Sequence, residues 1–151
     1  MRLFFDEDTG RGVPDALRAI GVECEYVSKK FFYKGGIAKQ TPDELWIPYA
    51  GRKEMLVFSC NKEILRAEAQ RKLWIAENVG GVFLTSGQEN NIGVLMLVLR
   101  RLEWLKEVDR KTRRPFAYMM GISGKWKLDP RVRLAAIDQA NADGPEGQSA
   151  F

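Results

Sequence analysis

The sequence contains no histidine and only two cysteines, Cys24 and Cys60. The absence of histidine excludes Ser-His-Asp and Cys-His triads, histidine acid-base pairs and every zinc site that needs a histidine ligand. The two cysteines form no C-x-x-C pair, so neither a disulfide framework nor a zinc knuckle is indicated. If the protein is a hydrolase, we expect its chemistry to depend on carboxylates and on a hard divalent metal held by their oxygens.

Long hydrophobic runs are also missing. The stretch "IGVLMLVL" at residues 92–99 falls well short of the roughly 18 to 20 apolar residues that a membrane span requires. The first strand-like segment reaches its acidic residues within the first six positions, which does not resemble a signal peptide. We therefore expect a cytoplasmic protein.

The composition is that of a single folded domain. A chain of 151 residues with 45% hydrophobic content is long enough to bury a real core. Its 24 Lys and Arg against 20 Asp and Glu give a net charge of +4. This excess is compatible with a polyanionic partner, and a slightly basic solvated surface explains it equally well.

Strand-like and helix-like segments alternate along the chain. Apolar strands are expected at residues 2–6, 22–27, 54–59, 81–86 and 114–123, and helices at 13–21, 41–51, 61–80 and 91–110. Residues 124–130 extend the last strand as a hairpin or lead into an edge segment. This alternation predicts an α/β fold, a three-layer α/β/α sandwich with a central, mainly parallel sheet of about five strands. Residues 138–151 are expected to form a flexible tail.

Acidic and polar side chains follow the strands. Asp6 and Asp8 come directly after the first strand, and Asn61 and Glu63 follow the third. Asp43 lies in the first turn of the second helix. Ligands of parallel sheets bind beyond the carboxyl ends of the strands, so these side chains are expected to converge there. Converging carboxylates repel one another unless a cation such as Mg²⁺ offsets them. The alternative is that the acids after the first strand only begin a loop.

Two segments, "LFFDEDTGRGVPDALRAIGVECEYV" at residues 3–27 and "TPDELWIPYAGRKEMLVFSCNKEI" at 41–64, resemble the PIN-like domain of the VapC-type toxin ribonucleases. The resemblance covers roughly residues 2–125 and rests on the order and spacing of short motifs. It implies a PIN-like domain over residues 1–137. It also implies an endoribonuclease that uses Mg²⁺ or Mn²⁺ to activate a water for cleavage of RNA phosphodiesters.

The resemblance assigns roles to the acids. Asp6 matches the first metal-coordinating acid of the family, Asp43 the acid of the second helix, and Glu63 the later acid. "FSCNKEI" stands where the family has a TxDxD pattern, so Ser59 replaces Thr and Asn61 replaces Asp. Asp8 and Asn61 are then lesser or outer contributors. Two alternatives stay open, an active nuclease and a catalytically weakened domain that binds RNA or protein.

Several basic and aromatic residues are candidates for contact with RNA. Arg11 and Lys62 are expected near the acidic edge, with a solvated surface charge as the alternative. The segment at residues 28–40 combines both types and is an RNA-binding candidate, a partner or dimer contact, or ordinary packing; its named members are Lys29, Lys30, Phe31, Tyr33 and Lys34. Weaker basic candidates are Arg66, Arg71, Lys72, Lys125, Lys127, Arg131 and Arg133. The resemblance further implies a cognate antitoxin, and a homodimer is left open.

Overall fold

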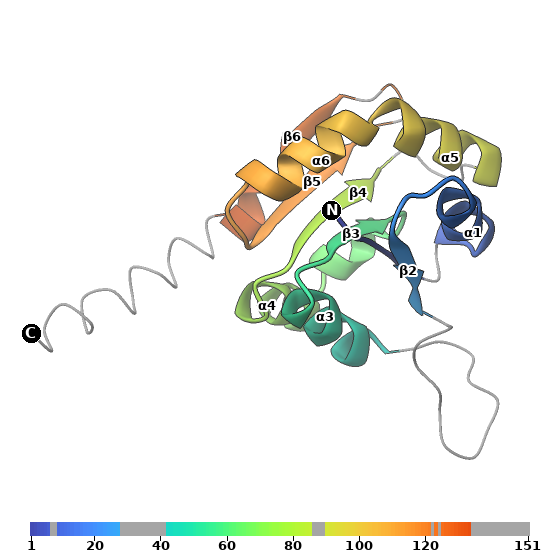
Figure 1. The fold of residues 1–151 in the computed structure, drawn as a ribbon. Coiled ribbons are helices and arrows are strands. Elements are labelled where there is room, and N and C mark those ends of the chain that lie inside the picture. Colours follow the sequence, from blue (N-terminus) through green and yellow to red (C-terminus); the bar gives the residue numbers. More distant parts are fainter. Residues whose placement is uncertain (7–8, 28–41, 86–89, 122, 124, 134–151) are drawn as a thin grey trace, which may run out of the picture.

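The computed structural model describes residues 1–6, 9–27, 42–85, 90–121, 123 and 125–133. These residues form one six-stranded sheet between two layers of helices (Figure 1). The strands are, in spatial order, β2 (Cys24–Tyr26), β1 (Leu3–Phe5), β3 (Leu56–Ser59), β4 (Gly80–Leu84), β5 (Phe116–Met120) and β6 (Trp126–Leu128). Neighbouring strands from β2 to β5 are parallel, and β6 pairs with β5 in the antiparallel sense. The expected mainly parallel sandwich is confirmed, and β6 adds a sixth, hairpin strand.

The order of the strands reverses between β1 and β3. The chain runs from β1 to β2 on one side and then crosses back, so that β3 pairs with the other side of β1. Phe5 at the end of β1 pairs with Tyr26 on β2 and with Phe58 on β3. The carboxyl ends of β1 and β3 are therefore neighbours at the reversal point, which is where open α/β sheets bind ligands.

Helices cover both faces of the sheet. On one face lie α3, the short 3-10 helix η2 and α4, and on the other lie α1, α5 and α6 (Figure 1). Their bounds are α1 (Gly12–Ala19), α3 (Asp43–Arg52), η2 (Lys62–Leu65), α4 (Glu68–Ala76), α5 (Asn91–Arg100) and α6 (Leu102–Lys111). Because both faces are covered, the central strands are apolar almost throughout instead of alternating with polar residues.

Tryptophan side chains fill the layer between the sheet and α3 and α4. Trp46 of α3 stacks on Phe4 of β1 with ring centroids 5.5 Å apart, and Trp74 of α4 meets Trp46 edge-on at 6.5 Å. The indole Nε1 of Trp74 donates a hydrogen bond of 3.1 Å to the carbonyl oxygen of Phe116 on β5. Both tryptophans are buried, and they fix the two helices against the middle of the sheet.

The helix expected over residues 91–110 is two helices, α5 and α6, which meet at Arg101. The three- and four-residue spacing of Ile92, Met96 and Leu99 in the sequence predicts that they face the core, and this prediction is wrong because all three are exposed. Val94, Leu97 and Val98 are the residues that α5 buries. Residues 92–99 are apolar on every side, so their spacing fits more than one face, and the break at Arg101 changes the phase of the buried stripe.

The second expected helix begins at Asp43, two residues after the start of the expected range 41–51. Pro42 is the N-cap of α3 and Asp43 its first residue, while Thr41, which the sequence Thr-Pro-Asp-Glu predicts as the cap, lies outside the described residues. Both cysteines are free, and Cys24 is buried in β2. In the described part of the chain, no helix is both long enough and apolar enough to span a membrane. The expected tail at residues 138–151 lies outside that part.

Gly81 in β4 is a position where a side chain does not fit. A Cβ atom there would lie 2.8 Å from ring carbons of Trp74 and 3.0 Å from the carbonyl oxygen of Val57. We expect Gly81→Ala to lower the free energy of unfolding by about 1–3 kcal/mol, measured by urea denaturation. Gly121→Ala is the control, because the nearest atom to its new Cβ is 3.8 Å away. Equal stabilities of the two variants would contradict the packing described for Trp74.

Candidate functional site

Asp6 is the buried acid at the reversal point of the sheet. It follows β1 directly and is only 3% exposed. The hydroxyl of Ser59, the last residue of β3, donates a hydrogen bond of 2.5 Å to its Oδ2 atom. The Thr9 hydroxyl donates to Oδ1 at 3.3 Å. A carboxylate removed from water requires such partners, so the neighbouring strand end and the loop after β1 hold Asp6 in place.

The turn after β3 is connected to Asp6 through Ser59. The Ser59 hydroxyl oxygen accepts a hydrogen bond of 2.9 Å from the backbone N–H of Asn61. The Asn61 side-chain oxygen in turn accepts the backbone N–H of Glu63 at 3.1 Å and so caps η2. Asn61 therefore has a local structural role that the sequence did not reveal, at the position where the related family has an acid.

Asp43 and Glu63 each bind a neighbour on their own helix. Asp43 Oδ1 accepts a hydrogen bond of 3.0 Å from the indole Nε1 of Trp46. Glu63 is mostly exposed and pairs with Arg66 at 2.8 Å. Because α3 leads into the amino end of β3 and η2 follows its carboxyl end, Asp43 and Glu63 both lie at the same edge of the sheet as Asp6.

The fit of a divalent cation to this edge is partial. The two hydroxyl oxygens that contact Asp6, those of Ser59 and Thr9, are of the hard type that Mg²⁺ and Mn²⁺ accept. In the part of the chain that the structure describes, however, no group of three or more His, Cys, Asp or Glu side chains is placed to hold a metal. Asp6, Asp43 and Glu63 are thus not gathered into one cluster. Asp8 lies outside the described residues, and the metal-binding roles stay a prediction.

Most of the candidates for contact with RNA lie outside the described residues. Arg11 is described, is largely exposed and pairs with Asp15 at 3.2 Å on the first turn of α1. An exposed ion pair of this kind fits the alternative that Arg11 is a solvated surface charge. The side chain of Lys62 is outside the description, as are Lys29, Lys30, Phe31, Tyr33 and Lys34.

Thr9 and Asn91 belong to this edge, although neither was among the residues predicted from the sequence. Thr9 is buried and also approaches the carbonyl oxygen of Phe58 at 3.4 Å. Asn91, at the start of α5, packs against the loop after β1, where Cβ atoms on Gly10 and Gly12 would lie 3.1 and 3.0 Å from its amide. Only a hydroxyl in "DEDTGRG" hinted at Thr9, and no local pattern could connect Asn91 to a loop 80 residues earlier.

Cys24 is not a candidate nucleophile. Burial raises the pKa of its thiol above the usual value, and the lowering effect of nearby Arg18 is smaller. Its Sγ lies 3.3 Å from the carbonyl oxygen of Pro14 and donates to it. The thiol therefore stays protonated at neutral pH, and Cys24 serves as a small buried residue of β2.

A family model described as "PIN like domain" matches residues 1–86, which is more than half of the chain. The match runs from β1 through β4 and includes Asp6, Asp43, Ser59, Asn61 and Glu63. The chain has no match among curated proteins and none among solved structures.

The hydrogen bond between Ser59 and Asp6 can be measured with a double-mutant cycle. We expect Ser59→Ala and Asp6→Asn to couple by about 1.5–3 kcal/mol in the free energy of unfolding, the usual range for a hydrogen bond to a charged group. The measurement is urea denaturation of the wild type, both single variants and the double variant. Thr85→Ala paired with Asp6→Asn is the control cycle, because the Thr85 hydroxyl, just after β4, bonds the carbonyl oxygen of Met120 instead. Additive effects in both cycles would contradict the proposed link.

Proposed function

Because this chain belongs to the PIN-like domain family, we propose that it is a ribonuclease in which Asp6 is the central carboxylate and Mg²⁺ or Mn²⁺ the cofactor. The observation that carries this proposal is the position of Asp6, a buried acid at the reversal point of a parallel sheet. A structural role alone does not require a charge there, and burying one is costly. We propose further that this ribonuclease is the toxin of a toxin–antitoxin pair and that its partner is the antitoxin.

The residues at this edge have distinct tasks in such a reaction. Ser59 and Thr9 fix the orientation of the Asp6 carboxylate through their hydroxyls. Asp43 and Glu63 add negative charge at the same edge, where Asp43 Oδ1 accepts the Trp46 indole N–H and Glu63 pairs with Arg66. When bound, a divalent cation supplies positive charge to a scissile phosphate and lowers the pKa of a bound water.

A second candidate is a weakened PIN-like domain that binds RNA without cutting it. Two observations favour it. Asn61 replaces an acid and uses its side-chain oxygen to cap η2. The three acids of the edge are also not gathered into one group among the described residues. Loss of one negative charge weakens the affinity for a divalent cation. If that affinity is too low for catalysis, the domain can still bind RNA but cannot cleave it.

Cleavage of RNA separates these two candidates. We expect purified protein to cut bulk RNA in Mg²⁺ or Mn²⁺, and Asp6→Asn to reduce the rate by about 100-fold or more, because a central ligand is lost. The rate is measured by release of fluorescence from a labelled RNA. Asp15→Asn is the matched control, since it makes the same chemical change to an acid on the surface of α1. Cleavage that survives both EDTA and Asp6→Asn would remove the nuclease proposal.

Asn61→Asp tests the metal site without relying on activity. The new carboxylate can still accept the Glu63 N–H that caps η2, and it adds the missing negative charge. We expect Mn²⁺ to bind about tenfold more tightly, equivalent to about 1.4 kcal/mol, in isothermal titration calorimetry. Asn78→Asp, which adds the same charge just before β4 at the opposite edge of the sheet, should leave the affinity unchanged. Equal Mn²⁺ affinities in the wild type and Asn61→Asp would favour the second candidate.

A further inference from the structure

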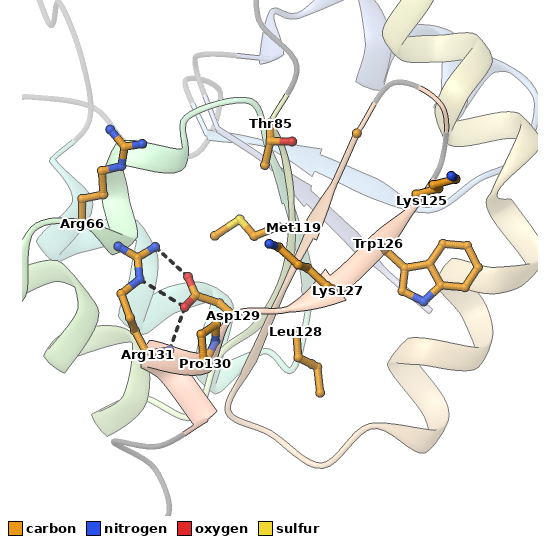
Figure 2. A pocket seen from close by; sticks show the side chains of 11 residues that line it. Arg66, Thr85, Met119, Lys125, Trp126, Lys127, Leu128, Asp129, Pro130 and Arg131 are labelled. Carbon is orange, nitrogen blue, oxygen red and sulfur yellow. Dashed lines mark hydrogen bonds and ion pairs between the residues drawn. The ribbon is translucent and has the colours of Figure 1, made fainter.

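A basic pocket of about 560 Å³ lies beside the Asp6 edge and is lined by none of the acids assigned to the proposed metal site. Three segments far apart in the sequence line it: the end of η2, the residue after β4 and the hairpin of β5 and β6. Its polar and charged side chains are Arg66, Thr85, Lys125, Lys127, Asp129 and Arg131. Figure 2 shows Lys127 extending over Met119 toward the side where Arg66 and Arg131 lie. The pocket thus brings together four cations and one acid.

We propose that this pocket binds the phosphate backbone of a single-stranded RNA, through Lys125 and Lys127 with Arg66 and Arg131 beside them. The choice of RNA as the polyanion rests on the function proposed above. The pocket itself does not depend on cleavage, so it serves an active nuclease and a weakened binding domain equally.

Two of the four cations are already paired. The Arg131 guanidinium donates to both carboxylate oxygens of Asp129, at 3.1 Å from Nε and 2.7 Å from Nη2 (Figure 2). Burial tends to raise the pKa of Asp129, but the side-chain and backbone hydrogen bonds from Arg131 outweigh it and hold that pKa below its usual value. Asp129 is therefore ionised at neutral pH and fixes Arg131 as a rigid wall of the pocket. Arg66 pairs with Glu63.

Lys125 and Lys127 carry the excess charge of the pocket. Both are exposed, and among the described residues neither has an acidic partner within 4.0 Å. A lysine ammonium is a compact, mobile charge that suits a phosphate whose position varies. Contact of these two side chains with a phosphate therefore breaks no ion pair within the described part of the chain.

The aromatic ring at the pocket is not available for stacking on bases. Trp126 lies 4.5 Å from Trp104 between ring centroids, and the Arg101 guanidinium carbon lies 5.3 Å from the Trp126 ring centre. In Figure 2 its side chain points to the opposite side of β6 from Lys127. The pocket therefore offers charge and not base recognition, and binding should depend strongly on salt and little on base sequence.

The position of the pocket suits an RNA that also reaches Asp6. Arg66, Thr85 and Gly121 each follow the carboxyl end of a parallel strand or its turn, so the pocket opens on the same edge as Asp6. β1 and β5 are separated by β3 and β4, which corresponds to three strand spacings, or roughly 14 Å. One strand of RNA can span that distance with a few nucleotides.

The test is binding of a short fluorescein-labelled oligouridylate in EDTA, measured by fluorescence anisotropy at several salt concentrations. We expect the double substitution Lys125→Ala and Lys127→Ala to weaken binding about tenfold at low salt. We also expect it to reduce the slope of log K against log salt by about 1.4, which is 0.7 for each lost phosphate contact. Lys125→Arg with Lys127→Arg keeps the charge and should bind as the wild type does.

Lys106→Ala with Lys111→Ala is the matched control, because it removes the same charge from exposed lysines of α6 on the other face of the sheet. Thermal unfolding of every variant checks that the fold is retained. If the control weakens binding as much as the pocket variant, or if neither does, or if the wild type does not bind, the pocket is not the RNA site. EDTA separates this result from cleavage. If the protein cleaves RNA but the pocket variant binds RNA normally, only this inference is refuted. If RNA binding depends on the pocket but no cleavage occurs, only the nuclease proposal is refuted.

Discussion

The hydrogen bond from the Ser59 hydroxyl to the Asp6 carboxylate joins two strands at the point where the strand order reverses. This hydrogen bond can form only if β1 and β3 stay parallel and in register, with Phe5 opposite Phe58. Removing a carboxylate from water costs several kcal/mol unless its oxygens are bonded. The sheet must therefore place a hydrogen-bond donor beside the buried Asp6 carboxylate. The Ser59 hydroxyl oxygen, which donates to Asp6, also accepts a hydrogen bond from the backbone N–H of Asn61.

The aromatic layer behind this point determines where α3 lies. Trp46 stacks on Phe4, two residues before Asp6, and its indole N–H is bonded to Asp43. Asp43 is thus held by the same side chain that packs the helix onto β1. The core and the acidic edge are coupled through one tryptophan.

Much of the fold could be predicted from the sequence, because buried parallel strands consist of short runs of apolar residues, such as "LFF" and "MLVF". Asp6 was predictable for a related reason, since a charge directly after such a run must lie at the end of a strand. α5 was not, because a helix that is apolar on every side has no unique buried face. The basic pocket was not predictable either: Arg66, Lys125, Lys127 and Arg131 were recognised as basic residues, but only the turn after β3 and the β5–β6 hairpin place them together.

β6 is a three-residue strand at the border of the sheet, and its outer side pairs with no other described strand. Open strand edges are sites where a second chain can add itself and begin aggregation, and short, charged edges resist this. Lys127 in the middle of β6, with Lys125 just before it, puts charge at that border. We expect the residues that we assign to a polyanion also to disfavour pairing of this edge with a second chain.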